Sequence, residues 1–123
     1  MKLELVRRVN SISFNLINKK TSIIIGQSII SCTNKTGSIN NIWINDMFQG
    51  KRLGSYLLLH SEQFLIEKFK VSDINILAWL KQNKSLLNFY TQHGYKVVDQ
   101  IPNHYDDGLD LYELVKVRKN VTP

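Results

Sequence analysis

Alternating apolar and polar residues dominate the first third of the chain. Residues 3–9, 11–18 and 21–32 are rich in Ile, Val, Ser and Thr, a composition that favours β-strands when it alternates. Residues 18–20 and 33–37 interrupt these runs with Asn, Lys and Gly, which are typical of turns. The pattern therefore predicts three consecutive strands separated by short turns.

The middle of the chain changes from a strand pattern to a helix pattern. Residues 39–45 alternate and include β-branched side chains, which predicts a fourth strand. Across residues 56–70 the apolar residues recur at spacings of four and seven, as on a helix face. The apolar residues that share one predicted helix face are Leu57, Leu58, Phe64, Leu65 and Phe69.

The last third predicts further alternation of strands and helices. Residues 74–80, 95–101 and 109–117 are the expected strands, and a short helix fits between the first two of them. Residues 102–108 contain Pro, Asn, Asp and Gly, which indicate a loop. This order predicts a mixed sheet with helices packed on it, in a single domain over residues 1–123.

A glycine-containing turn, Gln49-Gly50-Lys51-Arg52-Leu53-Gly54-Ser55, lies between the predicted strand and helix. A helix that begins at such a turn leaves several backbone N–H groups without partners. Its dipole adds partial positive charge at the same place, so the turn can bind phosphate. An ordinary turn that uses glycine for its backbone freedom is the alternative.

The segment from Ile42 to Ser55 resembles the acetyl-CoA signature of the GNAT superfamily of N-acetyltransferases. That signature is an alternating strand and a short linker, followed by Gln/Arg-x-x-Gly-x-Gly/Ala at the start of a helix. Gln49 and Gly54 match its first and last positions, whereas Arg52 replaces the usual middle glycine. Arginine is bulkier there, but its guanidinium can itself reach a phosphate.

A second GNAT-like signature lies downstream, from Asn83 to Tyr95. Asn83 suits a helix N-cap and Gly94 suits the left-handed position after a helix. Leu86, Phe89, Tyr90 and His93 are spaced to share one helix face. By resemblance, Tyr90 is the general acid that protonates the departing CoA sulfur. A buried core tyrosine is the alternative.

The resemblance implies a fold, an activity and a cofactor. The fold is α+β, with a mixed, mostly antiparallel sheet flanked by helices. The activity is direct transfer of the acetyl group from acetyl-CoA, a co-substrate, to a primary amine. The residues expected to bind acetyl-CoA are Ile42, Ile44, Gln49, Gly50, Lys51, Arg52, Leu53, Gly54, Ser55 and Asn83.

Family members usually have one or two helices between their first and second strands, where this chain is too short for them. We therefore expect an open acceptor side, or a homodimer that completes it. An open site favours a macromolecular acceptor, namely a protein, a peptide or an aminoacyl-RNA. His104 and Tyr105 match the position that contacts acceptors in peptide-acetylating members, although Tyr105 also fits a tyrosine packed on the sheet edge.

The general base is not defined by the sequence. The strand that often supplies a glutamate base in the family has Asn40, Asn41, Asn45 and Asp46 instead. Asp46, His104 or a water molecule are the alternatives, since the attacking amine must first lose its proton. The unusual Arg52 and the missing glutamate keep a second interpretation open: a catalytically inactive module that binds acyl-CoA, protein or RNA.

Composition adds few constraints. The net charge of +6 suits the phosphates of CoA, and the basic residues are too scattered to indicate a nucleic-acid surface. The single cysteine excludes an internal disulfide and favours a cytoplasmic location. The sequence shows no membrane-spanning segment and no signal peptide. Three widely spaced histidines predict no metal site.

Overall fold

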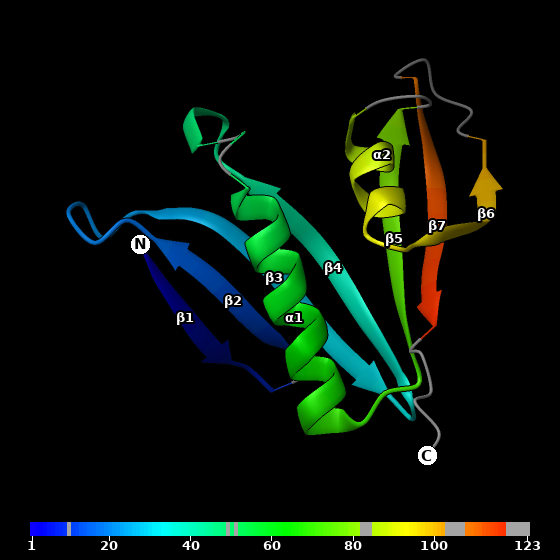
Figure 1. Ribbon diagram of the computed structural model, residues 1–123, viewed down its shortest axis with the longest axis horizontal. Coiled ribbons are helices and arrows are strands. Elements are labelled where there is room, and N and C mark those ends of the chain that lie inside the picture. Colours follow the sequence, from blue (N-terminus) through cyan, green and yellow to red (C-terminus); the bar gives the residue numbers. More distant parts are fainter. Residues whose placement is uncertain (10, 49, 51, 82–84, 103–107, 118–123) are drawn as a thin grey trace.

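The computed structural model describes residues 1–9, 11–48, 50, 52–81, 85–102 and 108–117. In them the chain forms seven strands, two α-helices and one short 3-10 helix (Figure 1). In chain order these are β1 (Lys2–Arg7), β2 (Ile12–Ile17), β3 (Ile24–Thr33), β4 (Thr36–Ile44), η1 (Asp46–Phe48), α1 (Leu53–Phe69), β5 (Asp73–Lys81), α2 (Ser85–Gln92), β6 (Lys96–Ile101) and β7 (Leu109–Val117).

All seven strands form one sheet in the order β1-β2-β3-β4-β5-β7-β6. The pairing of β4 with β5 is parallel, and the other pairs are antiparallel. A parallel pair needs a crossover, and α1 supplies it. The expected mixed, mostly antiparallel sheet with helices is therefore confirmed.

Several element boundaries differ from the sequence prediction, and two of these differences affect β4 and α1. Thr36 and Gly37 were expected in a turn but begin β4, because Thr33 pairs directly with Thr36 in a tight hairpin. Asn34 takes the left-handed conformation that this turn requires, with φ of 55°. In addition, α1 begins at Leu53 rather than at residue 56, so the last three residues of the glycine-containing turn form the first turn of the helix.

Both α-helices cover the same face of the sheet, as Figure 1 shows with α1 over β3 and β4 and α2 over β5. Leu57, Leu58 and Leu65 of α1 are fully buried against Ile30 and Ile39 of the sheet. Burial of such side chains is worth about 1.5–3 kcal/mol each. This core fixes α1, and hence its N-terminal end, relative to β4.

The connection from β1 to β2 is a short turn. β1 ends at Arg7 and β2 begins at Ile12, and the Arg8 N–H donates a 2.8 Å hydrogen bond to the Ser11 carbonyl. The expected absence of helices at this point is confirmed. The opposite face of the sheet is therefore left without a helix in the part of the chain that the structure describes.

The two parallel strands separate after a short paired segment. β4 and β5 pair from Thr36 with Asp73 as far as Ile39 with Ile76, and their remaining residues are not paired with each other. Figure 1 shows the strands diverging beyond this point, with α1 on one side of the opening and α2 on the other. Ile42 and Ile44 therefore belong to the part of β4 that has separated from β5.

Candidate active site

A cavity of about 690 Å³ lies where β4 and β5 diverge. Its lining comes from the end of β4, from η1, from the start of α1 and from α2. The lining residues are Ile42, Trp43, Ile44, Asp46, Phe48, Gly50, Arg52, Leu53, Gly54, Ser55, Leu86 and Phe89. The volume lies within the range of small-molecule and cofactor sites.

The N-terminal end of α1 opens onto this cavity. Arg52 is its N-cap residue and makes no side-chain capping hydrogen bond, because arginine has no acceptor atom. The first intrahelical bond runs from the Tyr56 N–H to the Arg52 carbonyl at 3.1 Å. The N–H groups of Leu53, Gly54 and Ser55 precede it, so they are free of intrahelical partners.

Arg52 has a left-handed backbone, with φ of 60° and ψ of 16°. Such angles are costly for a residue with a Cβ and are natural for glycine. This conformation explains why the GNAT signature has a glycine here. Arg52 thus has a backbone conformation that suits glycine, and this exposed residue lies at the cavity.

The short η1 helix places Asp46 and Phe48 at the cavity. Asn45 organises this turn, since its side-chain oxygen accepts the Met47 N–H at 3.0 Å and its carbonyl accepts the Phe48 N–H at 2.8 Å. The Asn45 N–H in turn donates to the Ile25 carbonyl at 2.7 Å. Asp46, one of the candidate bases, is thereby held on the cavity wall.

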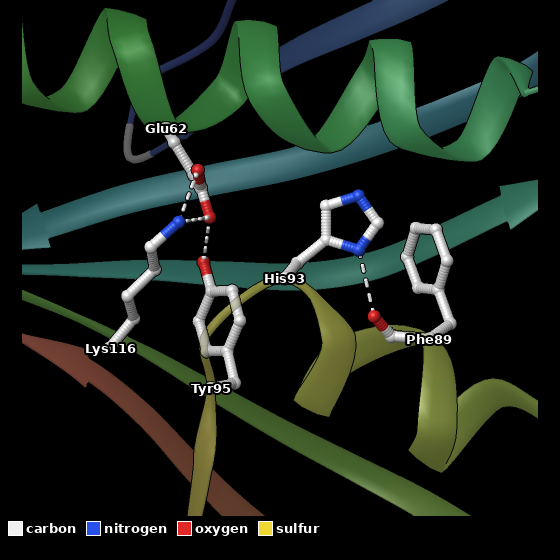
Figure 2. Close-up of polar contacts among 5 residues, drawn as sticks. All are labelled: Glu62, Phe89, His93, Tyr95 and Lys116. Carbon is white, nitrogen blue, oxygen red and sulfur yellow. Dashed lines mark hydrogen bonds and ion pairs between the residues drawn. The ribbon is translucent and has the colours of Figure 1, made fainter.

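α2 supplies an apolar wall opposite the start of α1. A Cβ on Gly54 would lie 3.4 Å from the Phe89 ring, which is an ordinary contact distance, so α1 and α2 meet at this point. His93 Nδ1 donates to the Phe89 carbonyl at 2.8 Å, and the two rings lie 4.5 Å apart (Figure 2). Phe89 is therefore held in place at the cavity by contacts from both helices.

Tyr90 is the neighbour of Phe89 but is not among the residues that line the cavity. It is 3% exposed, and its ring packs edge-on against Phe89 and Tyr95. Burial raises the pKa of Tyr90 to about 12. The hydroxyl therefore keeps its proton at neutral pH, as a general acid must before it acts.

A buried polar network fixes the end of α2 to α1 and β7 (Figure 2). Glu62 of α1 is 5% exposed and accepts a 2.7 Å hydrogen bond from the Tyr95 hydroxyl. Lys116 of β7 donates to the same carboxylate at 3.1 Å. Burial, and then the Glu62 carboxylate, raise the pKa of Tyr95. The network was not predicted, because its members are distant in sequence.

The structure brings most of the described candidate residues together. Ile42, Ile44, Gly50, Arg52, Leu53, Gly54 and Ser55 all line the cavity. Gln49, Lys51, Asn83, His104 and Tyr105 lie outside the described residues. The sequence prediction did not include Trp43, Phe48, Leu86 and Phe89 in the site. The spacing of Leu86 and Phe89 along one face with Tyr90 is the signal that could have identified those two.

The described residues contain no group of three or more His, Cys, Asp or Glu side chains that could hold a metal ion. None of the helices described here has the length and apolarity needed to cross a membrane.

Solved acetyltransferases have the same fold. A nourseothricin acetyltransferase matches with a TM-score of 0.74 and 16% identity, over 89% of this chain and 66% of its own. An acetyltransferase from Bacillus cereus ATCC 14579 matches with a TM-score of 0.74 and 22% identity, over 94% of this chain and 74% of its own. A chain of the NatC complex bound to Gag peptide and CoA matches with a TM-score of 0.71 and 14% identity, over 86% of this chain and 70% of its own.

The sequence was also compared with curated proteins and with protein-family profiles. A search of curated proteins finds no match to this chain. The profile described as the Acetyltransferase (GNAT) family matches residues 10–95, which is more than half of the sequence. Together with the divergent β4 and β5 strands, this match shows that the chain belongs to the GNAT acetyltransferase family.

Proposed function

We propose that the chain transfers the acetyl group of acetyl-CoA directly to a primary amine on a protein, a peptide or an aminoacyl-RNA. The observation that supports this most is the cavity at the divergence of β4 and β5, which is lined by an apolar wall and by the N-terminal end of α1. Bound there, acetyl-CoA would supply an activated acyl group. Family membership and the fold support the same activity.

The residues present fit this co-substrate. The N–H groups of Leu53, Gly54 and Ser55, together with the Arg52 guanidinium, are suited to a pyrophosphate. Ile42, Ile44, Leu86 and Phe89 suit the less polar pantetheine arm. Beyond Ile39 and Ile76, β4 and β5 do not pair with each other, so their backbones face the same path.

Positioning accounts for much of the proposed rate enhancement. Binding two reactants in one cleft replaces a bimolecular encounter and is worth up to about 7–11 kcal/mol when the geometry is ideal. Asp46 is the described candidate for accepting the amine proton, directly or through water. Tyr90 is the candidate that holds the proton needed by the departing sulfur, and it lies directly behind the cavity-lining Phe89. A solved relative bound to a peptide and CoA supports a macromolecular acceptor.

A screen of amine acceptors tests this proposal. Purified protein is incubated with acetyl-CoA and either peptides with free amines or aminoacyl-RNA, and acetylated product is measured by mass spectrometry. We expect product formation that falls about 10²-fold or more in a Tyr90→Phe variant, in line with typical general-acid contributions. Binding of acetyl-CoA without product for any acceptor class would instead favour an inactive acyl-CoA-binding module.

A further inference from the structure

Both tryptophans of the chain are exposed residues on the strands that diverge, Trp43 on β4 and Trp79 on β5. Their positions along the strands place both on the face of the sheet that no described helix covers. On β5, Ile76 and Leu80 are buried beneath the helices. Side chains alternate between the two faces along a strand, so Trp79, an odd number of residues from both, lies on the opposite face and is 55% exposed. On β4, a Cβ on Gly26 would meet both Ile44 and the buried Leu16, which places Ile44 on the helix face. Its neighbour Trp43 therefore faces the other way and is 42% exposed.

The two tryptophans border the same opening. β4 and β5 last pair at Ile39 and Ile76. Trp79 is three residues beyond this pair, or about 10 Å along the strand. Trp43 is four residues beyond it. However, β4 has one extra residue relative to β3 between Asn40 and Trp43, so Trp43 advances along the strand by about three residues. The indoles thus stand at similar heights on opposite sides of the divergence, and Trp43 also lines the candidate cofactor cavity.

The surface beside Trp79 is acidic although the chain is basic. Glu113 and Asp99 are paired across β7 and β6 in the row next to Trp79, on the same face. The Asn75 amide donates to the Glu113 carboxylate at 2.5 Å and so orients it. The described charged side chains of this face that lie nearest Trp79 are these two carboxylates, whereas Asp73 and Lys96 lie farther toward the closed end, in the rows of Val117 and Val115.

We propose that Trp43 and Trp79 form the acceptor-binding wall of this site and that they select a basic peptide. This inference rests on the proposed function. Tryptophan faces attract cations, and neighbouring carboxylates strengthen that preference. The same carboxylates repel the phosphates of RNA. The wall continues into the cofactor cavity at Trp43, so a peptide amine bound there has a route to the reacting end of the cavity.

Single-tryptophan variants test the inference directly. Trp79→Phe leaves Trp43 as the only indole, and Trp43→Phe leaves Trp79. The tryptophan fluorescence of each variant is first followed on addition of acetyl-CoA. In separate titrations without acetyl-CoA, it is followed on addition of an arginine-rich peptide, a glutamate-rich peptide of equal length, or bulk tRNA. We expect acetyl-CoA to change Trp43 emission and the arginine-rich peptide alone to change Trp79 emission. Non-specific attraction to a +6 chain predicts the reverse order of ligands.

Activity provides a second readout. Trp79→Ala should lower kcat/KM for the arginine-rich peptide roughly 3- to 10-fold, as expected for loss of a cation–π contact, with unchanged affinity for acetyl-CoA. Val117→Ala is the matched control, because Val117 lies on the same face at the closed end of the sheet and is 71% exposed. It should leave both values unchanged.

The outcomes separate the two ideas. Absence of any Trp43 response to acetyl-CoA contradicts the proposed function, whereas the peptide titrations still decide the inference. A Trp79 that ignores the arginine-rich peptide, or that responds to tRNA or to the glutamate-rich peptide, overturns the inference alone. The same holds if Trp79→Ala changes only the sedimentation coefficient, which would make this face an interface between two copies of the chain.

Discussion

Replacing Arg52 by glycine should stabilise the protein and weaken its binding of acetyl-CoA at the same time. Arg52 has φ of 60° at the N-cap of α1. A left-handed backbone costs an L-residue about 1–2 kcal/mol, and glycine avoids this cost but loses more entropy on folding. We therefore expect a net gain of about 0.5–1 kcal/mol in the free energy of unfolding.

The loss of the guanidinium acts on binding. A hydrogen bond to a charged group contributes about 1.5–3 kcal/mol when it is well formed. Arg52 is exposed, so solvent screening reduces this to about 1 kcal/mol. The dissociation constant of acetyl-CoA should thus rise about fivefold, at about 1.4 kcal/mol for each factor of ten. Stability and affinity move in opposite directions.

Lys70 provides the matched control. It has φ of 53° at the C-cap of the same helix, and 17 helical residues, about 25 Å, separate it from Arg52. Lys70→Gly should stabilise the protein by a similar amount and leave the affinity unchanged. Urea unfolding and calorimetric titration measure the two quantities. Tighter binding by Arg52→Gly would refute the reasoning, because it would mean that the arginine obstructs the site.

Three further predictions concern the helices and their contacts. Gly54→Ala should preserve acetyl-CoA affinity and add about 0.5–1 kcal/mol of stability, since its Cβ would make an ordinary 3.4 Å contact with Phe89; a tenfold loss of affinity would contradict this. Because burial raises the pKa of Tyr90 to about 12 while an unfolded tyrosine ionises near 10, its contribution to stability is intact below pH 10 and is lost as pH rises toward 12. Thermal unfolding between those values should depend less steeply on pH in Tyr90→Phe, and equal slopes would refute it. Lys116→Met should lower the free energy of unfolding by about 1–3 kcal/mol, because it leaves the buried Glu62 carboxylate without its cation. Urea unfolding should show that adding Glu62→Gln restores part of this loss. Purely additive effects of the two substitutions would argue against the pairing.

Local patterns were enough to predict the order of the elements. Strands β1 to β5 and helix α1 follow from the change of hydrophobic period, and β7 was placed at its observed bounds. The errors arose where tertiary contacts override local preference. Thr36 and Gly37 look like turn residues, but pairing with β3 and β5 extends the strand through them. Gly54 was expected in the turn but lies inside α1, beside Phe89.

The site was predictable only as far as one segment reaches. Arg52, Gly54 and Ser55 are contiguous in a recognisable signature, and the structure places them at the cavity. Trp43 was not predicted, because its orientation depends on a register irregularity between β3 and β4 that the sequence does not display. The Glu62–Lys116 pair spans 54 residues, and such a contact follows from the sheet order rather than from any local pattern.

The most direct test of the central claim is a calorimetric titration with acetyl-CoA, with adenosine as the control ligand. It is run on the unmodified chain and on Gly54→Leu, whose side chain would extend into the cavity beside Phe89. Saturable binding of acetyl-CoA to the unmodified chain, lost in Gly54→Leu and absent for adenosine, is the predicted result. No binding of acetyl-CoA, or equal binding to both proteins, would contradict a cofactor site at the divergence of β4 and β5.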